Sequence, residues 1–201
     1  VTLLLQQPEV QAAELKGIWH LLHQRFLCRP DLTSNPVQAS ANDLTLHSGT
    51  GALTFKDMDA SIIPGDHEVK ATLDCLPASS LHNTPVNITV HRDRNGKNPV
   101  TRWSLDTRGT ALPCSAIADF LPEMERLGLN AEYTGTMTWQ LEPNHWWIDI
   151  SGSRFTDISL DRVFENNSHR LSGTANINFD RCRIDPHSKR SDISGSIVAR
   201  N

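Results

Sequence analysis

Residues 137–141 read Met-Thr-Trp-Gln-Leu, and residues 146–150 read Trp-Trp-Ile-Asp-Ile. In the first stretch apolar and polar residues alternate strictly, which is the pattern of a β-strand with one face buried and the other in water. In the second, Trp146 shares a face with Ile148, whereas Trp147 lies on the opposite face. Both stretches therefore predict strands with one apolar side.

The same period of two recurs along most of the chain. Strands are predicted at residues 44–46, 52–55, 86–90, 103–105 and 175–179, with strand-like runs at 1–5 and 193–199. Clusters of turn-forming residues separate several of them, at residues 64–66, 94–96 and 186–188. The chain is therefore predicted to be rich in β-structure, with half of each strand facing water.

Two stretches have a helical period instead. From Pro8 onward, apolar residues recur every three or four positions until a second proline prevents continuation, which predicts a helix over residues 8–28. A shorter helix is predicted over residues 115–127, with Ser115 as its N-cap and Pro122 dividing it into two turns. Both helices are predicted as insertions in a β-rich chain.

Size and charge exclude several classes of protein. The 201 residues suffice for one large domain with its own core. Nineteen basic and 23 acidic residues give a net charge of −4, and no basic run exceeds two residues, so nucleic acid is not an expected partner. The longest apolar run, Leu3 to Leu5, is far below the roughly 18 residues that span a bilayer.

Four cysteines occur without a Cys-x-x-Cys motif: Cys28, Cys75, Cys114 and Cys182. The spacing gives no indication of a zinc knuckle or of a thioredoxin-like redox site. In an oxidising compartment three disulfide pairings are possible, and the sequence does not choose among them. The alternative is that the cysteines are small buried hydrophobic residues.

A short motif of an apolar residue, serine, glycine and a hydroxyl residue recurs in the second half of the chain. Its glycines are Gly152, Gly173 and Gly195, which are 21 and 22 residues apart, and Thr134-Gly-Thr136 is a looser copy. This period suggests stacked pairs of strands, each with a glycine where strands cross or bend.

The same segments carry a resemblance to a known family. Residues 150–161 read Ile-Ser-Gly-Ser-Arg-Phe-Thr-Asp-Ile-Ser-Leu-Asp, and residues 169–175 read His-Arg-Leu-Ser-Gly-Thr-Ala. Together with residues 103–113, Trp-Ser-Leu-Asp-Thr-Arg-Gly-Thr-Ala-Leu-Pro, they resemble the C-terminal module of AsmA-like and TamB-like proteins. The resemblance covers roughly residues 100–199 well and the first hundred residues only loosely.

The resemblance implies a fold, a location and a partner. Members of this family are anchored in the inner membrane of Gram-negative bacteria and extend into the periplasm, where a curved sheet carries lipids on its apolar face. We therefore expect a mainly β chain with two short helices, in a curved antiparallel sheet that forms an open β-groove or half-barrel. The predicted groove-lining residues are Trp103, Leu105, Trp139, Leu141, Trp146, Ile148, Ile177 and Phe179.

No metal site or cofactor is predicted. His20 and His23 are three residues apart on the predicted first helix, and Cys28 follows, so the three residue types suit a metal ion. The interpretation we adopt is a solvated polar face opposite the apolar stripe of that helix. The other seven histidines are scattered among turns.

No catalytic residues are predicted either. Asp149, Asp157 and Asp161 are close in sequence, but Asp149 lies on the polar face of a strand and the other two flank turns. Residues 151–153 lack the Gly-x-Ser-x-Gly spacing of a nucleophile elbow. We therefore predict that the protein is not an enzyme.

The leading hypothesis is that residues 1–201 are a single β-rich module of a longer chain, in the periplasmic part of an inner-membrane-anchored bacterial protein. The module would bind phospholipid or another acyl lipid and contact adjacent modules of the same chain, in lipid transfer or outer-membrane biogenesis. The alternative is a carbohydrate-binding or adhesive β-sandwich with Trp147 as its platform. A purely structural β-domain is the third hypothesis.

Overall fold

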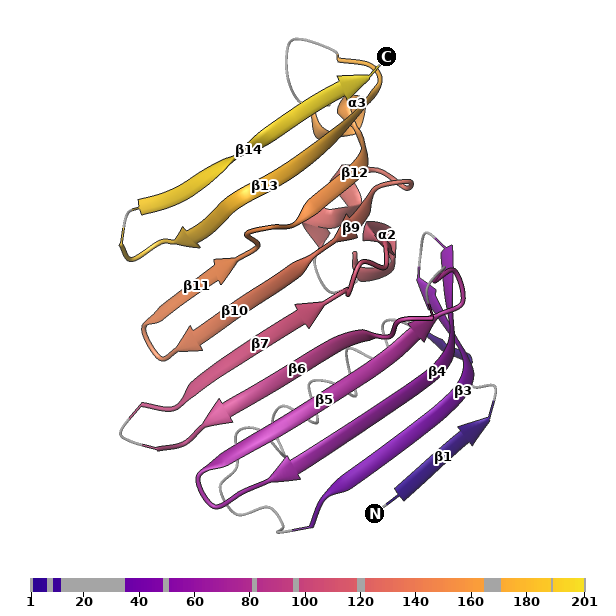
Figure 1. Ribbon diagram of the computed structural model, residues 1–201, viewed down its shortest axis with the longest axis vertical. Coiled ribbons are helices and arrows are strands. Elements are labelled where there is room, and N and C mark those ends of the chain that lie inside the picture. The colour runs from indigo at the N-terminus through magenta and orange to yellow at the C-terminus, as the bar shows by residue number, and fades with distance from the viewer. Residues whose placement is uncertain are drawn as a thin grey trace.

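One large β-sheet contains nearly all the regular structure of the chain (Figure 1). The computed structural model describes residues 2–6, 9–11, 35–48, 51–80, 83–95, 98–118, 122–164, 171–188 and 190–200. The predicted fold class, mainly β with two short helices in a curved, open antiparallel sheet, is confirmed. The described strands form a single sheet, so the two packed sheets that the sandwich alternative required are not found among them.

The first half of the sheet is a meander of long antiparallel strands. Its strands are β3 (Val37–Ser48), β4 (Gly51–Pro64), β5 (Glu68–Pro77), β6 (Val86–Asp93) and β7 (Val100–Asp106). At its edge β1 (Thr2–Gln6) and β2 (Glu9–Gln11) both pair in parallel with β3. Glu9–Gln11 is therefore a strand and not the first turn of the predicted helix 8–28, because its backbone pairs with Thr45–His47. The remainder of that helix lies outside the described residues.

The second half is built from interrupted strands. Its strands are β8 (Leu112–Pro113), β9 (Glu132–Thr134), β10 (Thr136–Glu142), β11 (His145–Asp149), β12 (Arg154–Ser159), β13 (Thr174–Asp185) and β14 (Arg190–Arg200). Strand β10 pairs with β7 and β11, while β11 and β12 pair with different parts of β13. Strand β14 pairs with β13 along its whole length and forms the edge of the described sheet (Figure 1).

The helical segments are short and lie beside this second half. Helix α2 spans Cys114–Ile117, the 3-10 helix η2 spans Pro122–Leu127, and α3 spans Leu160–Val163. The first two occupy the region of the predicted helix 115–127. The residue preceding α2 is Pro113, so Ser115 lies inside the helix and is not its N-cap.

Strand register divides the sheet into an apolar and a polar face. One row of paired residues across seven strands is apolar, and the row beside it is polar. The apolar row is Ile62, Ala71, Val90, Trp103, Trp139, Ile148 and Ile184. The polar row is Ser61, Thr72, Thr89, Ser104, Thr138, Asp149 and Arg183. Successive side chains point to opposite faces, so each row belongs to one face.

Described residues that follow β7 in the chain pack against the apolar face and form buried clusters with it. Leu112 packs in one cluster with residues of β3 to β6, namely Ala41, Leu44, Leu46, Phe55, Cys75 and Val86. Cys114, Ala131 and Tyr133 form a second cluster, against which Met124 and Leu127 of η2 pack. Helix α2 contacts both β3 and β4. The described residues of the segment from Leu112 to Ala131 (112–118 and 122–131) therefore cover one end of the apolar face.

Three cysteines belong to this buried structure. Cys75, Cys114 and Cys182 are free thiols, and all three are buried. Burial, with a smaller contribution from the negative charge of Asp74, raises the pKa of Cys75 to about 12. Burial and then Glu132 raise the pKa of Cys114 to about 11. The reading of these three as small buried hydrophobic residues therefore fits the structure, while Cys28 lies outside the described residues.

A bend crosses the second half of the sheet at Ser153. Gly135, between β9 and β10, and Gly152, between β11 and β12, both have positive φ angles, of 139° and 72°. Ser153 is 2% exposed, and its hydroxyl donates to the carbonyl oxygen of Thr136 at 2.8 Å. A Cβ on Gly135 would lie 2.5 Å from Ser153 Oγ, and one on Gly195 would lie 2.0 Å from the carbonyl oxygen of Asn178. Gly135 and Gly195 thus permit close approach of neighbouring chain segments, whereas a Cβ on Gly152 would meet nothing within 4 Å.

Substitution of Cys75 with alanine should make the stability less dependent on alkaline pH. Because the folded protein holds the thiol proton more tightly than the unfolded chain, the stabilisation is complete below the ordinary pKa near 9.0 and is lost as pH rises toward about 12. Urea unfolding between about pH 8 and pH 11, with reductant present, measures the free energy of unfolding. We expect the free energy of unfolding to fall more steeply with pH for the parent than for Cys75→Ala. Equal slopes would contradict a raised pKa of Cys75 in the folded protein.

Replacing Gly135 with alanine should destabilise the protein more than replacing Gly152. Both positions have positive φ, which costs an L-residue about 1 kcal/mol, but a Cβ on Gly152 has no neighbour within 4 Å. At Gly135 the added methyl meets Ser153, and overpacking costs about 1–3 kcal/mol more. Urea titration followed by tryptophan fluorescence should give a loss of about 2–4 kcal/mol for Gly135→Ala and about 1 kcal/mol for Gly152→Ala. Equal losses of stability in the two variants would contradict the predicted clash between a side chain at position 135 and Ser153.

Candidate functional site

All eight predicted groove residues lie on the apolar face. Trp103 is paired with Trp139, and Trp139 is paired with Ile148 on its other side. Leu141 is paired with Trp146, and Leu105 continues the face two residues beyond Trp103. Ile177 and Phe179 lie on the part of β13 that pairs with Ile197 and Gly195 of β14.

The eight residues differ in their exposure. Trp103 packs against the buried pair Val69 and Val90, and Leu105 packs against two core clusters. In contrast, Trp139 is 37% exposed and Trp146 is 40% exposed. The first two residues therefore belong mainly to the core, and the two exposed indoles mark the accessible part of the face.

The exposed apolar surface extends to the edge strand β14. Ile193 pairs with Cys182 and is 57% exposed, and Ile197 pairs with Ile177 and is 70% exposed. Neither isoleucine was among the predicted groove residues. The alternation of Ile193, Gly195 and Ile197 could have predicted them, because it places both isoleucines on the face of their β13 partners.

Three aromatic rings lie beside the bend on this same face. Phe155 contacts Phe179 edge-on with a centroid distance of 6.2 Å and contacts Tyr133 at 5.0 Å. The Tyr133 hydroxyl forms a 2.9 Å hydrogen bond with Ser153 Oγ, so its polar end is satisfied within the bend. Phe179 also lines an open depression of about 530 Å³, whose other lining residues are mainly polar: Thr134, Gly135, Gly152, Ser153, Arg154, Asn178 and Asp180.

The opposite face is polar and tightly paired. Arg102 donates two hydrogen bonds to Gln140 Oε1, at 2.9 and 3.3 Å. Trp147, the residue of the carbohydrate alternative, is half-buried, and the guanidinium of Arg183 lies 4.3 Å from its ring centroid. An arginine therefore covers one face of the ring on which a sugar would stack.

The three carboxylates weighed as catalytic candidates each have a separate local role. Asp149 accepts the backbone N–H of Ser151, and Asp157 has a positive φ in the irregular part of β12. Asp161 accepts the hydroxyl of Ser159, which lowers the pKa of this exposed carboxyl. Among the described residues, no hydrogen bond or ion pair joins any two of the three.

Ser151 and Ser153 each have a structural partner among the described residues. Ser151 Oγ accepts the backbone N–H of Cys182, and Ser153 holds the bend. His20, His23 and Cys28 lie outside the described residues. The scattered-histidine interpretation needs a correction, because two hairpin ends bring His145 and His187 together beside Asp185. Because 40 or more positions separate His145 from the other two residues, the sequence alone did not indicate that the three meet.

Comparisons with known proteins do not identify the chain. No protein-family model matches it, and no curated protein or solved structure matches it either. In the part of the chain that the structure describes, no helix is long and apolar enough to cross a membrane.

Proposed function

We propose that this chain is a non-enzymatic module of the bacterial cell envelope that binds phospholipid acyl chains on the apolar face of its sheet. Its role would be in lipid transfer or outer-membrane biogenesis, in the periplasmic part of an inner-membrane-anchored protein. The observation that carries the proposal is the exposure of Trp139 and Trp146 on a face where their own strand partners, Trp103, Ile148 and Leu141, are apolar.

Apolar surface that stays exposed to water is costly in free energy. Soluble proteins rarely expose large contiguous apolar patches unless these bind a partner. Each methylene group of a lipid that leaves water for such a surface contributes about 0.8 kcal/mol. From β7 to β14 the apolar face crosses four inter-strand spacings, which is roughly 19 Å and enough for an extended acyl chain.

The exposed tryptophans favour a lipid over a purely apolar partner. An indole combines a large apolar ring with one N–H donor, and this combination places tryptophan at boundaries between hydrocarbon and polar groups. Trp146 lies next to the β10–β11 turn, whereas Phe179 and Ile177 lie further across the face. We therefore place the lipid headgroup near Trp146 and the acyl chain across β11, β13 and β14.

The edge of the sheet supports adjacent modules of the same chain as partners. Within the described residues β14 pairs with β13 alone, and it has eleven residues. A long edge strand is a template for pairing with another strand. The resemblance of residues 103–113 and 150–175 to AsmA-like modules is in keeping with such a continuation. The carbohydrate alternative is less favoured, because Arg183 covers the ring of Trp147.

Replacing Trp146 with serine should weaken lipid binding, whereas replacing its neighbour Trp147 should not. The two residues are adjacent in sequence and lie on opposite faces, so they form a matched pair. Loss of a buried aromatic contact of about 1.5–3 kcal/mol should lower the affinity for a fluorescent long-chain fatty acid by about tenfold or more in Trp146→Ser. Circular dichroism checks that both variants keep the fold.

The native ligand is sought in the protein purified from a Gram-negative host. Solvent extraction followed by mass spectrometry should recover phospholipid from the parent chain and less from Trp139→Glu. Thr138→Glu, which places the same charge on the polar face, serves as its control. Recovery of no phospholipid, together with no fatty-acid binding by the parent, would refute the proposal.

A further inference from the structure

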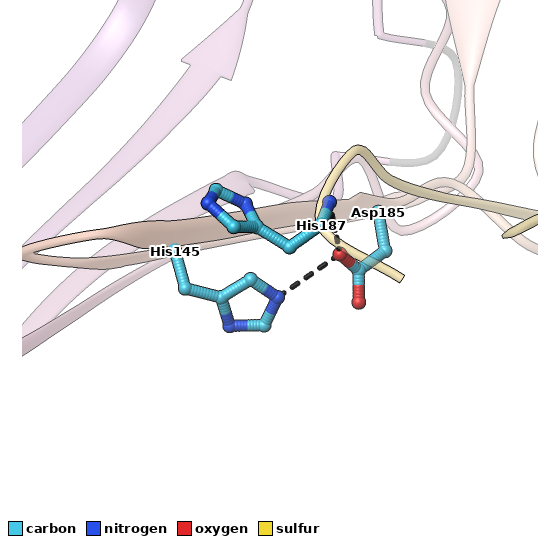
Figure 2. Close-up of side chains that lie close together, drawn as sticks. All are labelled: His145, Asp185 and His187. Carbon is cyan, nitrogen blue, oxygen red and sulfur yellow. Dashed lines mark hydrogen bonds and ion pairs between the residues drawn. The ribbon is translucent and has the colours of Figure 1, made fainter. Parts of the chain in front are cut away.

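Two hairpin ends meet at one corner of the polar face. His145 is the first residue of β11, directly after the β10–β11 turn, and Asp185 is the last residue of β13. His187 lies in the turn between β13 and β14 (Figure 2). The side chains thus come from two hairpins, and strand pairing between β11 and β13 sets their separation.

The three side chains present two imidazoles and a carboxylate to one point. His145 Nε2 lies 3.0 Å from Asp185 Oδ1, and the two imidazole rings are edge-on at 5.2 Å between centroids. One ligand atom from each residue lies within 4.8 Å of the others. Figure 2 shows both rings on the same side of the Asp185 carboxylate.

Hydrogen bonds within the turn hold the Asp185 carboxylate in place. Asp185 Oδ1 accepts the backbone N–H groups of His187 at 3.0 Å and Ser188 at 3.1 Å. The Ser188 hydroxyl donates to the carbonyl oxygen of Asp185 at 3.1 Å, which closes the turn. The Asp185 side chain is only 15% exposed. Its orientation is therefore fixed by the turn, and it faces His145.

A second carboxylate lies behind His145. Glu142 Oε1 is 3.9 Å from His145 Nδ1, and Gln140 Nε2 donates to the same oxygen at 2.7 Å. At 3.9 Å this contact is an ion pair and not a hydrogen bond. A small movement of either side chain would let His145 Nδ1–H donate to Glu142, the contact that commonly fixes the ring and tautomer of a metal-bound histidine. This arrangement leaves Nε2 of His145 as the nitrogen that faces Asp185.

We propose that His145, Asp185 and His187 form a binding site for a divalent transition-metal ion of the zinc type, with Glu142 orienting His145. Two imidazole nitrogens and one carboxylate oxygen are a ligand set that zinc accepts, and a fourth position remains for water or a partner. Tetrahedral ligand atoms around zinc are roughly 3.4 Å apart, from bonds of about 2.0–2.2 Å. The three ligand atoms, which lie within 4.8 Å of one another here, therefore have to come closer by up to about 1.4 Å when zinc binds.

The charge and the position of the cluster are consistent with a cation that ties two hairpins together. Glu142 and Asp185 supply two carboxylates beside His145, while the nearest arginine on β13, Arg183, is stacked on Trp147. Strands β11 and β13 are paired through only Ile148–Ile184 and Asp149–Arg183. An ion bound by His145 from one side of this seam and Asp185 from the other would strengthen it.

Isothermal titration of the purified chain with zinc chloride tests the proposal. We expect one ion per chain at this site and at least a tenfold loss of affinity in each of His145→Ala, His187→Ala and Asp185→Asn. Asparagine keeps an oxygen for the turn hydrogen bonds, so Asp185→Asn separates loss of the ligand charge from loss of the turn. Glu142→Gln should weaken binding by about tenfold as an orienting residue.

His91→Ala is the matched control. His91 also pairs with a carboxylate, Glu68 Oε2 at 2.7 Å, but this pair belongs to no three-ligand group among the described residues. The control should keep the parent affinity and the zinc-induced rise in melting temperature, which the ligand variants should lose. Zinc affinity unchanged in both His145→Ala and His187→Ala would overturn the proposal. Displacement of zinc by millimolar Mg²⁺ would overturn the nitrogen ligation.

Discussion

Strand register is the constraint on which this sheet depends, because a slip of one residue would exchange its apolar and polar faces. The chain keeps register across irregular points by inserting single residues. Among the described strands, such points lie in β4 between Phe55 and Asp57, in β12 between Phe155 and Ile158, and in β13 between Phe179 and Arg181. In each strand two apolar residues three positions apart remain on the same face. A β-bulge therefore preserves the one-sided core where the sequence departs from strict alternation.

This behaviour explains which strands the sequence predicted. Strict alternation located β10 and most of β11, because large apolar residues stand two positions apart at Met137, Trp139 and Leu141, and again at Trp146, Ile148 and Ile150. Strand β12 was not predicted, since the three-residue spacing of Phe155 and Ile158 hides a period of two. Strand β5 was not predicted either, since Lys70, Ala71 and Asp74 are weak strand formers that its two neighbours hold in place. Strand β2 depends on parallel pairing with β3, which local spacing does not encode.

The two candidate sites also differ in how far the sequence alone predicts them. The apolar face follows from local alternation, so the sequence placed all eight of its predicted residues on one side. What it could not give was their exposure, because that depends on where the segment from Leu112 to Ala131 covers the face. The cluster of His145, Asp185 and His187 depends on the pairing of β11 with β13 and on the turn after Asp185. Neither this pairing nor this turn can be deduced from the sequence before the strand register is known.

The division between the core and the proposed lipid-binding surface follows from the same geometry. On the apolar face, Val69 and Val90 of the first half are 1% and 2% exposed, whereas Trp146 and Ile197 of the second half are 40% and 70% exposed. The second half also contains the interrupted strands and the short β11–β13 pairing, so it has fewer ladder hydrogen bonds to resist opening. A part of a sheet that has to admit a ligand is expected to have lower local stability. A metal ion on the polar side of the β11–β13 seam would stabilise this part without occupying the apolar face, because adjacent residues such as His145 and Trp146 lie on opposite sides of the sheet.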